Sequence, residues 1–399
     1  MSQPHRQVRL APALRPLDIA YGIPFGDDPV GPLERDLSVG SPREAIDAVL
    51  AEALARTPCL ISFSGGRDSS ALLAAAVRVA RREGLDLPIP ATLVFPQSEA
   101  SNEDEWQAIV LDHLGLSEWE RFEIVDEFDA VGPVATQALL RHGLLWPFNT
   151  HFHAPIIERA AGGSVVTGFG GDELGRSLDS ARAERILSDK RLKSRQDLLV
   201  VGLAASPSAV RAMVHRRRVR ALMDGIPWLT EEGQRQLVRA YGASEGNIPL
   251  GWEATIRRWM WPGRYFRLCV ESFDVLGSYH EVQVVHPFVE RRVLDALGTA
   301  GGFRGVGGRT ELMRDVFGDV LPPELVERTT KGTFTDPLWT ETAMRFAREW
   351  SGEGVDRALV DPDALRRHWA GETRNLVSTT LLQSAWLHDH GPGSPLVTA

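Results

Sequence analysis

Between Cys59 and Gly171 the sequence repeats one pattern, in which a short apolar run is followed by a longer stretch with helical periodicity. Short apolar runs between helical stretches are typical of buried strands. Strands that alternate with helices are joined by right-handed crossovers and lie parallel in one sheet, with helices on both faces. We therefore expect a doubly wound α/β fold. The expected strands lie within 59–66, 91–96, 121–125 and 164–171, and the helices between them within 69–84, 103–115 and 153–163.

Two further regions flank this α/β core. Residues 1–40 contain six prolines and few periodic apolar positions, which predicts an extended arm that lies on a domain. Ser41, with Glu44 three residues later, has the pattern of a capping box, so we expect a helix from there to about residue 56. We assign residues 41–180 to the α/β domain. Strand signals fade beyond it, and residues 181–399 are expected to be mainly helical.

Composition excludes several classes of protein. The 399 residues are 43% hydrophobic and 24% charged, as in a globular protein of one large or two medium domains. The 53 acidic and 44 basic residues give a net charge of -9, which disfavours a dedicated binder of nucleic acid or anionic lipid. Cys59 and Cys269 are too few for a disulfide framework or a zinc cage, which fits a reducing cytoplasm. No window nears 18 apolar residues, so neither a secretion signal nor a membrane span is expected.

One segment departs from the acidic balance. Residues 182–220 contain eleven Lys or Arg and three Asp or Glu, a local net charge of +8. Such a segment is either a solvated helix face or a surface that meets an acidic substrate or partner, and the sequence leaves both interpretations open.

A glycine-rich loop follows the first expected strand. Ser64-Gly65-Gly66 leads into Asp68-Ser69-Ser70 where a helix should begin. The N-terminus of a helix carries unpaired N–H groups and a partial positive charge, glycines let the backbone approach a phosphate, and serine hydroxyls add donors. No lysine follows as in a Walker A loop, and the dinucleotide pattern GxGxxG is absent. The loop is therefore either an anion site of another kind or an ordinary strand-to-helix turn.

The string SGGRDSS at 64–70 resembles the SGGxDSS signature of the PP-loop ATP pyrophosphatases, which cleave ATP between its α and β phosphates. Three later stretches resemble motifs of one branch, the synthetase domain of the asparagine synthetase family, and occur in the family's order. They are TGFGGDEL at 167–174, HPFVE at 286–290, and the region that runs from ELMR at 311–314 through LPPE at 321–324 to RTTKGTF at 328–334. The resemblance covers roughly residues 45–390.

This resemblance implies a fold and an activity. The fold is the adenine nucleotide alpha hydrolase-like PP-loop sheet. The family, which includes β-lactam synthetase and lasso-peptide cyclases, adenylates a carboxylate with ATP, releases pyrophosphate and AMP, and forms a C–N bond. We expect ATP and Mg²⁺ as cofactors, and a carboxylate and an amine as small-molecule or peptide substrates. We also expect a role in natural-product or modified-peptide biosynthesis, with a partner protein as one possible source of nitrogen.

The resemblance also implies roles for individual residues. Asp68 and Asp172 follow strands that should be neighbours, so both carboxylates can reach one Mg²⁺, as matching aspartates of the family do. Lys331 matches the lysine that the family places over the acyl-adenylate, and Arg314 matches an arginine near the phosphates. The phosphate-binding residues would be Ser64, Gly65, Gly66, Asp68, Ser69 and Ser70 of the first loop and Gly168, Gly170 and Asp172 of the second.

The chain departs from the family at the expected general base. Phe169 stands where the family has Glu or Tyr, and a phenyl ring cannot exchange a proton. Gln283 stands where an acid normally lies, four residues before the Pro-Phe pair. Either the nucleophile needs no base, because an amine that binds neutral can attack an adenylate directly, or His280, Glu281 or His286 supplies one.

A second departure concerns the nitrogen source. Glutamine-dependent members begin with a catalytic cysteine and a glutaminase domain, whereas this sequence has Ser2 and about 45 residues before the synthetase region. We therefore expect nitrogen to come from free ammonia, a partner subunit or an amine on the substrate.

Other features have structural explanations. His151 and His153 lack a third ligand at suitable spacing for a metal site. The aromatic residues of 252–266 fit a helical core, and Glu103, Asp104 and Glu105 suit the start of a helix, although the family has an acidic pair nearby. Two other functions stay open: a catalytically silent nucleotide-binding homologue that acts as a partner subunit, and a PP-loop RNA-modifying enzyme.

Overall fold

The computed structural model describes residues 10–96, 98, 101, 103–125, 128–174, 183–184, 186–188, 194–328, 338–371 and 375–391. Its sheet has five parallel strands in the order β3-β2-β1-β4-β5. Starting from β1, the chain adds two strands on one side and then returns to the other side, so the order reverses between β1 and β4. A crevice forms at such a switch point beyond the carboxyl ends of the strands. The four strands that the sequence predicts are β1 (Cys59–Ser62), β2 (Ile89–Val94), β3 (Glu120–Glu123) and β4 (Ser164–Val166).

The fifth strand, β5 (Gln283–Val285), is a correction to the sequence analysis, which expects four strands. It pairs with β4 in parallel, with Val165 opposite Val284. β5 has only three residues, and this length leaves no periodic signal that separates it from the neighbouring helices. The sheet therefore takes one strand from the part of the chain assigned to the mainly helical region.

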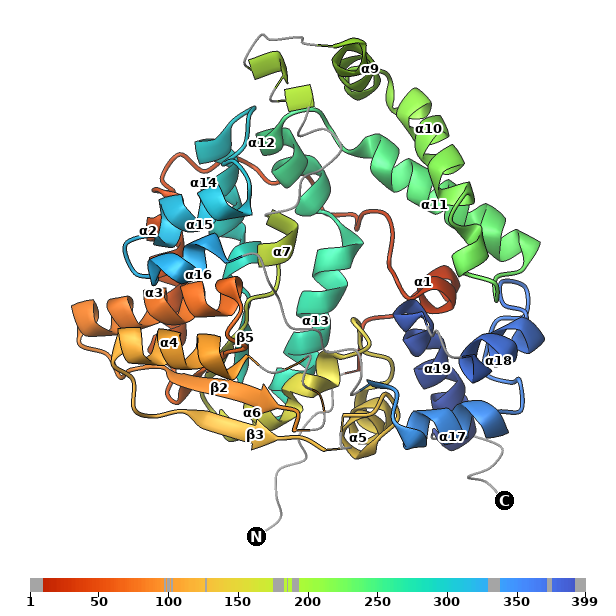
Figure 1. The fold of residues 1–399 in the computed structure, drawn as a ribbon, viewed down its shortest axis with the longest axis horizontal. Coiled ribbons are helices and arrows are strands. Elements are labelled where there is room, and N and C mark those ends of the chain that lie inside the picture. The colour runs from red at the N-terminus through yellow and green to blue at the C-terminus, as the bar shows by residue number, and fades with distance from the viewer. Residues whose placement is uncertain are drawn as a thin grey trace.

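Alternate strand residues build two cores, one on each face of the sheet. Ile61, Val166 and Val285 point into one core, whereas Val165 and Val284 point into the other. Figure 1 shows the helices of the first face together at one side of the sheet, with α13 crossing the middle of the molecule. The first face carries α2 (Pro42–Leu54), α3 (Arg67–Glu83), α4 (Asp104–Leu114), α14 (Arg291–Gly301), α15 (Arg309–Phe317) and α16 (Pro323–Glu327). The second face carries α5 (Pro133–His142), α6 (Ala154–Arg159) and α13 (Arg264–Ser278).

The predicted helix boundaries on the first face are confirmed. Ser41 caps α2 and forms the expected capping box with Glu44. Gly84 and Gly115 end α3 and α4 in the left-handed conformation, with φ of 67° and 61°, which glycine adopts without steric cost.

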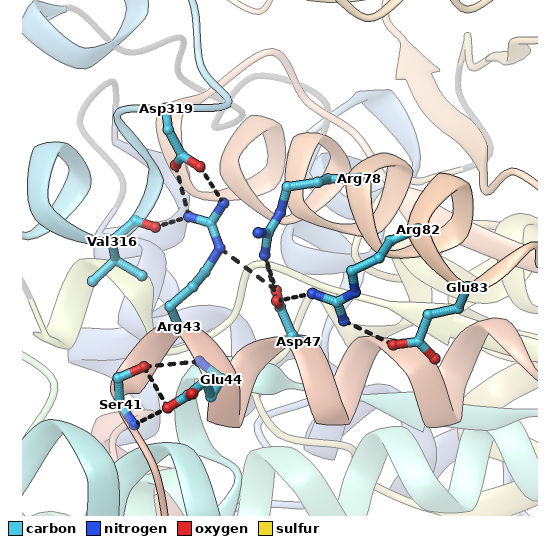
Figure 2. A network of polar contacts seen from close by, with 9 residues as sticks. All are labelled: Ser41, Arg43, Glu44, Asp47, Arg78, Arg82, Glu83, Val316 and Asp319. Carbon is cyan, nitrogen blue, oxygen red and sulfur yellow. Dashed lines mark hydrogen bonds and ion pairs between the residues drawn. The ribbon is translucent and has the colours of Figure 1, made fainter.

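A network of charges fastens α2 to its neighbours (Figure 2). The buried carboxylate of Asp47 accepts hydrogen bonds from Arg78 and Arg82 of α3. Arg43, one turn before Asp47, donates to the carbonyl of Val316 at the end of α15 and pairs with Asp319. The network therefore holds α3 and α15 in a fixed relation, and both of these helices begin at the candidate site.

The second half of the chain adds two groups of helices. One is a core of α11 (Glu231–Asn247), α17 (Glu341–Glu349), α18 (Pro362–Ala370) and α19 (Thr379–His390), against which α1 (Pro16–Tyr21) of the N-terminal arm packs. The other is a limb of α9 (Arg195–Ala204), α10 (Ser208–Arg220) and α11, which stands away from the sheet in Figure 1. Pro262 lies between α13 and a π-helical turn at Ile256–Met260, and this turn directly continues the short helix α12 (Trp252–Thr255).

The described part of the N-terminal arm is mostly extended, as predicted, and contains the short helix α1. Asp18 of α1 and Arg264 of α13 form a buried ion pair at 2.8 Å, which fixes the arm against the body of the protein. In the part of the chain that the structure describes, no single helix has the length and apolarity to cross a membrane. The pair α9 and α10, bent by 115°, meets the criteria of length and composition alone.

Candidate active site

The first loop of the site follows β1 and enters α3, as the sequence predicts. Its serines are engaged within the loop: the Ser69 hydroxyl accepts a hydrogen bond from the Ser64 amide at 3.2 Å and donates to the Gly66 carbonyl at 3.1 Å. Gly65 has φ +81°, and a Cβ there would lie 2.9 Å from the Gln107 side chain. The loop is therefore a tight backbone turn that keeps α3's first N–H groups directed beyond the sheet edge.

The second loop follows β4 and enters the short helix α7 (Gly171–Leu174). It touches the first loop at Asp68. A Cβ on Gly171 would lie 2.5 Å from the Asp68 Cγ, and one on Gly168 would lie 3.3 Å from the Ser69 amide nitrogen. Gly170 faces the other way: it has φ +93°, and a Cβ there would lie 2.4 Å from Val289. Glycines are required in this loop because two backbones and a neighbouring helical turn meet there.

A cavity of about 390 Å³ opens between the two loops. Asp68 and Asp172 lie on its wall, and both carboxylates accept hydrogen bonds from a single guanidinium, that of Arg309. The other described residues that line it are Ser62, Ser64, Gly66, Arg67, Ser69, Pro147, Asn149, Thr150, His153, Thr167, Gly168, Phe169, Cys269 and Phe273. The sequence prediction that the two aspartates converge at one edge of the sheet is confirmed.

Three predicted phosphate-binding residues are not among the described residues that line the cavity. Ser70 is fully buried, and its hydroxyl has no hydrogen-bond partner among the described residues. Gly65 and Gly170 act through the backbone shape of their loops.

Of the two cationic side chains predicted for catalysis, the structure describes only Arg314, which is not among the residues that line the cavity. Arg314 lies on α15, is half-exposed and pairs with Glu327. Lys331 lies outside the described residues. Their roles stay predictions.

The structure brings two other arginines to the site that sequence reasoning missed. Arg309 is the first residue of α15, five positions before Arg314. Arg67 is the first residue of α3, and its guanidinium donates to the Thr310 hydroxyl at 3.1 Å. An arginine at a helix N-terminus opposes the helix dipole, which is the sequence signal that could have indicated a nearby anion.

A third arginine, Arg328, supports the first loop from behind. Its guanidinium donates to the Gly65 carbonyl at 3.0 Å, pairs with Glu103 and stacks on Trp106 at 4.5 Å. Glu103, at the N-cap of α4, thus has an ion-pair partner next to the loop, whereas Asp104 is exposed and pairs with Arg121.

Two buried histidines, His151 and His286, and the half-buried His153 lie on or behind the cavity wall. Burial lowers the pKa of His151 and His153 to about 4 and that of His286 to about 3, so all three are neutral at pH 7. His151 contacts the backbone carbonyls of Phe148 and Phe128. No cluster of His, Cys, Asp or Glu suited to a metal ion occurs in the residues searched, those that the structure describes. The backbone contacts of His151 support its interpretation as a structural residue, whereas His153 lines the cavity and its role stays a prediction.

The residues considered as general bases lie at two different edges of the sheet. Gln283 begins β5 opposite Ser164, and the His280 carbonyl accepts a hydrogen bond from the Gly162 amide. These contacts put His280, Glu281 and Gln283 at the amino edge of the sheet, roughly 10 Å of strand from the cavity. As alternative bases, His280 and Glu281 are therefore wrong. His286 lies at the correct edge, but it is buried and bound to the Thr167 hydroxyl at 2.6 Å.

Phe169 forms part of an aromatic wall. Its ring stacks on Tyr265 at 6.4 Å and meets the edge of His286 at 5.6 Å. Trp252 and Phe266 are buried in the core, as predicted for the aromatic residues of this stretch, and Tyr265 donates to Glu173 at 2.9 Å. The wall next to Phe169 is thus apolar.

Comparison with protein-family models identifies the family of this chain. The sequence model described as asparagine synthase matches residues 43–388, which covers both loops, β5 and the helices around the cavity. The chain belongs to the asparagine synthase family. Membership makes it an ATP-dependent ligase of the PP-loop type, and the α/β fold expected from the sequence is confirmed.

A solved structure of NMN synthetase from Francisella tularensis is similar over 88% of this chain and 95% of that one, at 10% identity and a TM-score of 0.23. A search of curated proteins finds no match.

Proposed function

We propose that this member of the asparagine synthase family adenylates a carboxylate with ATP and then joins it to an amine. The observation that carries the proposal is the meeting of the two loops at one cavity, with Asp68, Asp172 and Arg309 on its wall. Helix N-termini, hard oxygen ligands and a guanidinium together suit a polyphosphate.

The proposed reaction has two steps. A carboxylate oxygen of the substrate attacks the α-phosphorus of ATP, the bond between that phosphorus and the bridging oxygen breaks, and pyrophosphate leaves. An amine nitrogen then attacks the acyl carbon, the acyl C–O bond breaks, AMP leaves and the nitrogen loses a proton. Charge builds on phosphate oxygens in the first step and on the acyl oxygen in the second, so a fixed cation accelerates both. Lys331 is proposed for that role because of its place in the family motif.

The residues present fit a divalent cation. Two carboxylates from different loops converge closely enough to share one guanidinium, and carboxylate oxygens are the ligands that Mg²⁺ prefers. Asp68 and Asp172 would hold it, and when bound the ion would supply positive charge to the phosphates.

The nucleophile is proposed to be an amine or ammonia that binds neutral. Phe169 cannot accept a proton, and His153 is the one imidazole on the described part of the cavity wall. Its pKa of about 4 makes it a weak proton acceptor. An amine within the substrate, free ammonia or a partner subunit could supply the nitrogen. We further propose a role in natural-product or modified-peptide biosynthesis in the cytoplasm.

The test is a carboxylate-dependent exchange of labelled pyrophosphate into ATP in the presence of Mg²⁺, followed by analysis of the nucleotide released when an amine is added. Exchange and AMP release are expected. Release of ADP would refute adenylation, and nucleotide binding without exchange for any carboxylate would favour the silent homologue.

A further inference from the structure

Arg309 holds together the two loops that the proposed function assigns to nucleotide binding. One amino group of its guanidinium donates to Asp172 and the other to Asp68. Asp68 follows β1 and Asp172 follows β4, so the two loops have one cation in common. Arg67 adds a neighbouring contact, because its guanidinium donates to Thr310, the next residue of α15.

Two carboxylates that share a cation repel each other when it leaves. At separations of about 4 Å, the repulsion between two charges is worth a few kcal/mol at a protein surface. Arg309 therefore does part of what a bound divalent cation would do: its single positive charge offsets half of the charge of the two carboxylates, and its two hydrogen bonds keep their loops together. A guanidinium and a metal ion cannot both occupy the space between the same two carboxylates.

Not every hydrogen-bond donor of the Arg309 guanidinium has a partner among the described residues. Its Nε is buried and has no hydrogen-bond partner among the residues that the structure describes, although both amino groups are paired. A guanidinium can offer five donors, and a phosphate accepts them more fully than two carboxylates on one side do. Arg309 lines the cavity, so a polyphosphate there lies within reach of its side chain.

We propose that Arg309 is an internal counter-cation that occupies the metal position in the nucleotide-free protein and turns to the phosphates when metal and nucleotide bind together. The inference rests on the proposed function for the identity of that ligand, a metal–ATP complex. Its consequence is that metal alone binds weakly, because it must displace Arg309 without offering this side chain a new anion. Metal with nucleotide binds well, because the phosphates supply that anion.

The test measures metal binding without turnover. Mn²⁺ is titrated into the nucleotide-free full-length protein and free Mn²⁺ is read by electron paramagnetic resonance. Arg309→Ala should bind Mn²⁺ at least roughly tenfold more tightly than the wild type. A tenfold change in Kd corresponds to about 1.4 kcal/mol of binding free energy. The Mn²⁺ affinity of Arg309→Lys should lie between those of the wild type and Arg309→Ala, since one ammonium cannot donate to both carboxylates as a guanidinium fork does. Arg348→Ala, which removes a half-exposed arginine paired with Glu341, is the matched control and should leave Mn²⁺ affinity unchanged.

Thermal unfolding gives a second measurement. Mg²⁺ alone should raise the Tm of Arg309→Ala by more than it raises the Tm of the wild type, because the ion replaces the missing cation. If Arg309→Ala does not fold without metal, the Mg²⁺-induced rise in Tm is compared between Arg309→Lys and the wild type instead. Equal Mn²⁺ affinities and equal Mg²⁺ shifts for wild type and variants would overturn the inference.

The same titrations with ATP present separate this inference from the proposed function. If the wild type binds Mn²⁺–ATP but Arg309→Ala gains no affinity for metal alone, the proposed role of Arg309 is refuted and the proposed ligase function is unaffected. If the wild type binds no Mn²⁺–ATP, the proposed function is refuted. The affinities of wild type and Arg309→Ala for Mn²⁺ alone then still test the role of Arg309.

Discussion

The ion pair of Arg328 and Glu103 should contribute more to stability and nucleotide binding than any exposed pair. Their side chains are only 3% and 7% exposed. Truncation of one partner leaves the other charge buried and uncompensated, which costs about 3–5 kcal/mol. Arg328→Ala also removes the hydrogen bond to Gly65 and the stacking on Trp106, so it should be the more damaging single change.

The assay is urea unfolding followed by fluorescence, together with the Kd for ATP. Arg348→Ala, whose pair with Glu341 is 54% and 70% exposed, should cost less than about 1 kcal/mol and serves as the surface control. The double change Arg328→Met with Glu103→Leu should recover much of the stability, since no buried charge remains. It should not recover ATP affinity, because the Gly65 carbonyl has lost its donor.

This double variant distinguishes a positioning role from a purely structural one. Recovery of both stability and ATP affinity would mean that the pair serves packing alone. Single variants that lose no more stability than Arg348→Ala would refute the argument from burial.

Three further predictions follow from the site. Lys331→Ala should abolish product formation and leave ATP binding nearly unchanged, as measured by turnover and calorimetry; retained turnover would remove Lys331 from catalysis. Gly170→Ala should lower the Tm and weaken ATP binding, because alanine is strained at φ +93° and its Cβ would lie 2.4 Å from Val289; an unchanged Tm would contradict this. Stability should fall below about pH 6.5, since the unfolded chain protonates His153 and His286 there, whereas the folded protein keeps them neutral down to about 4 and 3. Each contributes a slope of up to about 1.4 kcal/mol per pH unit, and substitution of either by Gln should flatten the profile in urea unfolding.

Local signals in the sequence predicted the elements that need no distant partner. The capping box of Ser41 and Glu44 and the closing glycines Gly84 and Gly115 lie where the sequence placed them. The convergence of Asp68 and Asp172 also followed from sequence, because parallel strands bring their carboxyl ends to one edge.

Other parts of the site were decided by tertiary structure. β5 is recognisable as a strand only through its pairing with β4, since three residues carry no period. The bond between Arg309 and Asp68 joins residues 241 positions apart, and that between Arg328 and Gly65 joins residues 263 apart. The sequence by itself determined that both loops lie at one edge of the sheet, because parallel strands bring their carboxyl ends to the same edge. The order of the strands is fixed by their pairing in the folded sheet. Which cations reach those loops depends on how α15 and α16 pack on α3 and α4, and that packing exists only in the folded chain.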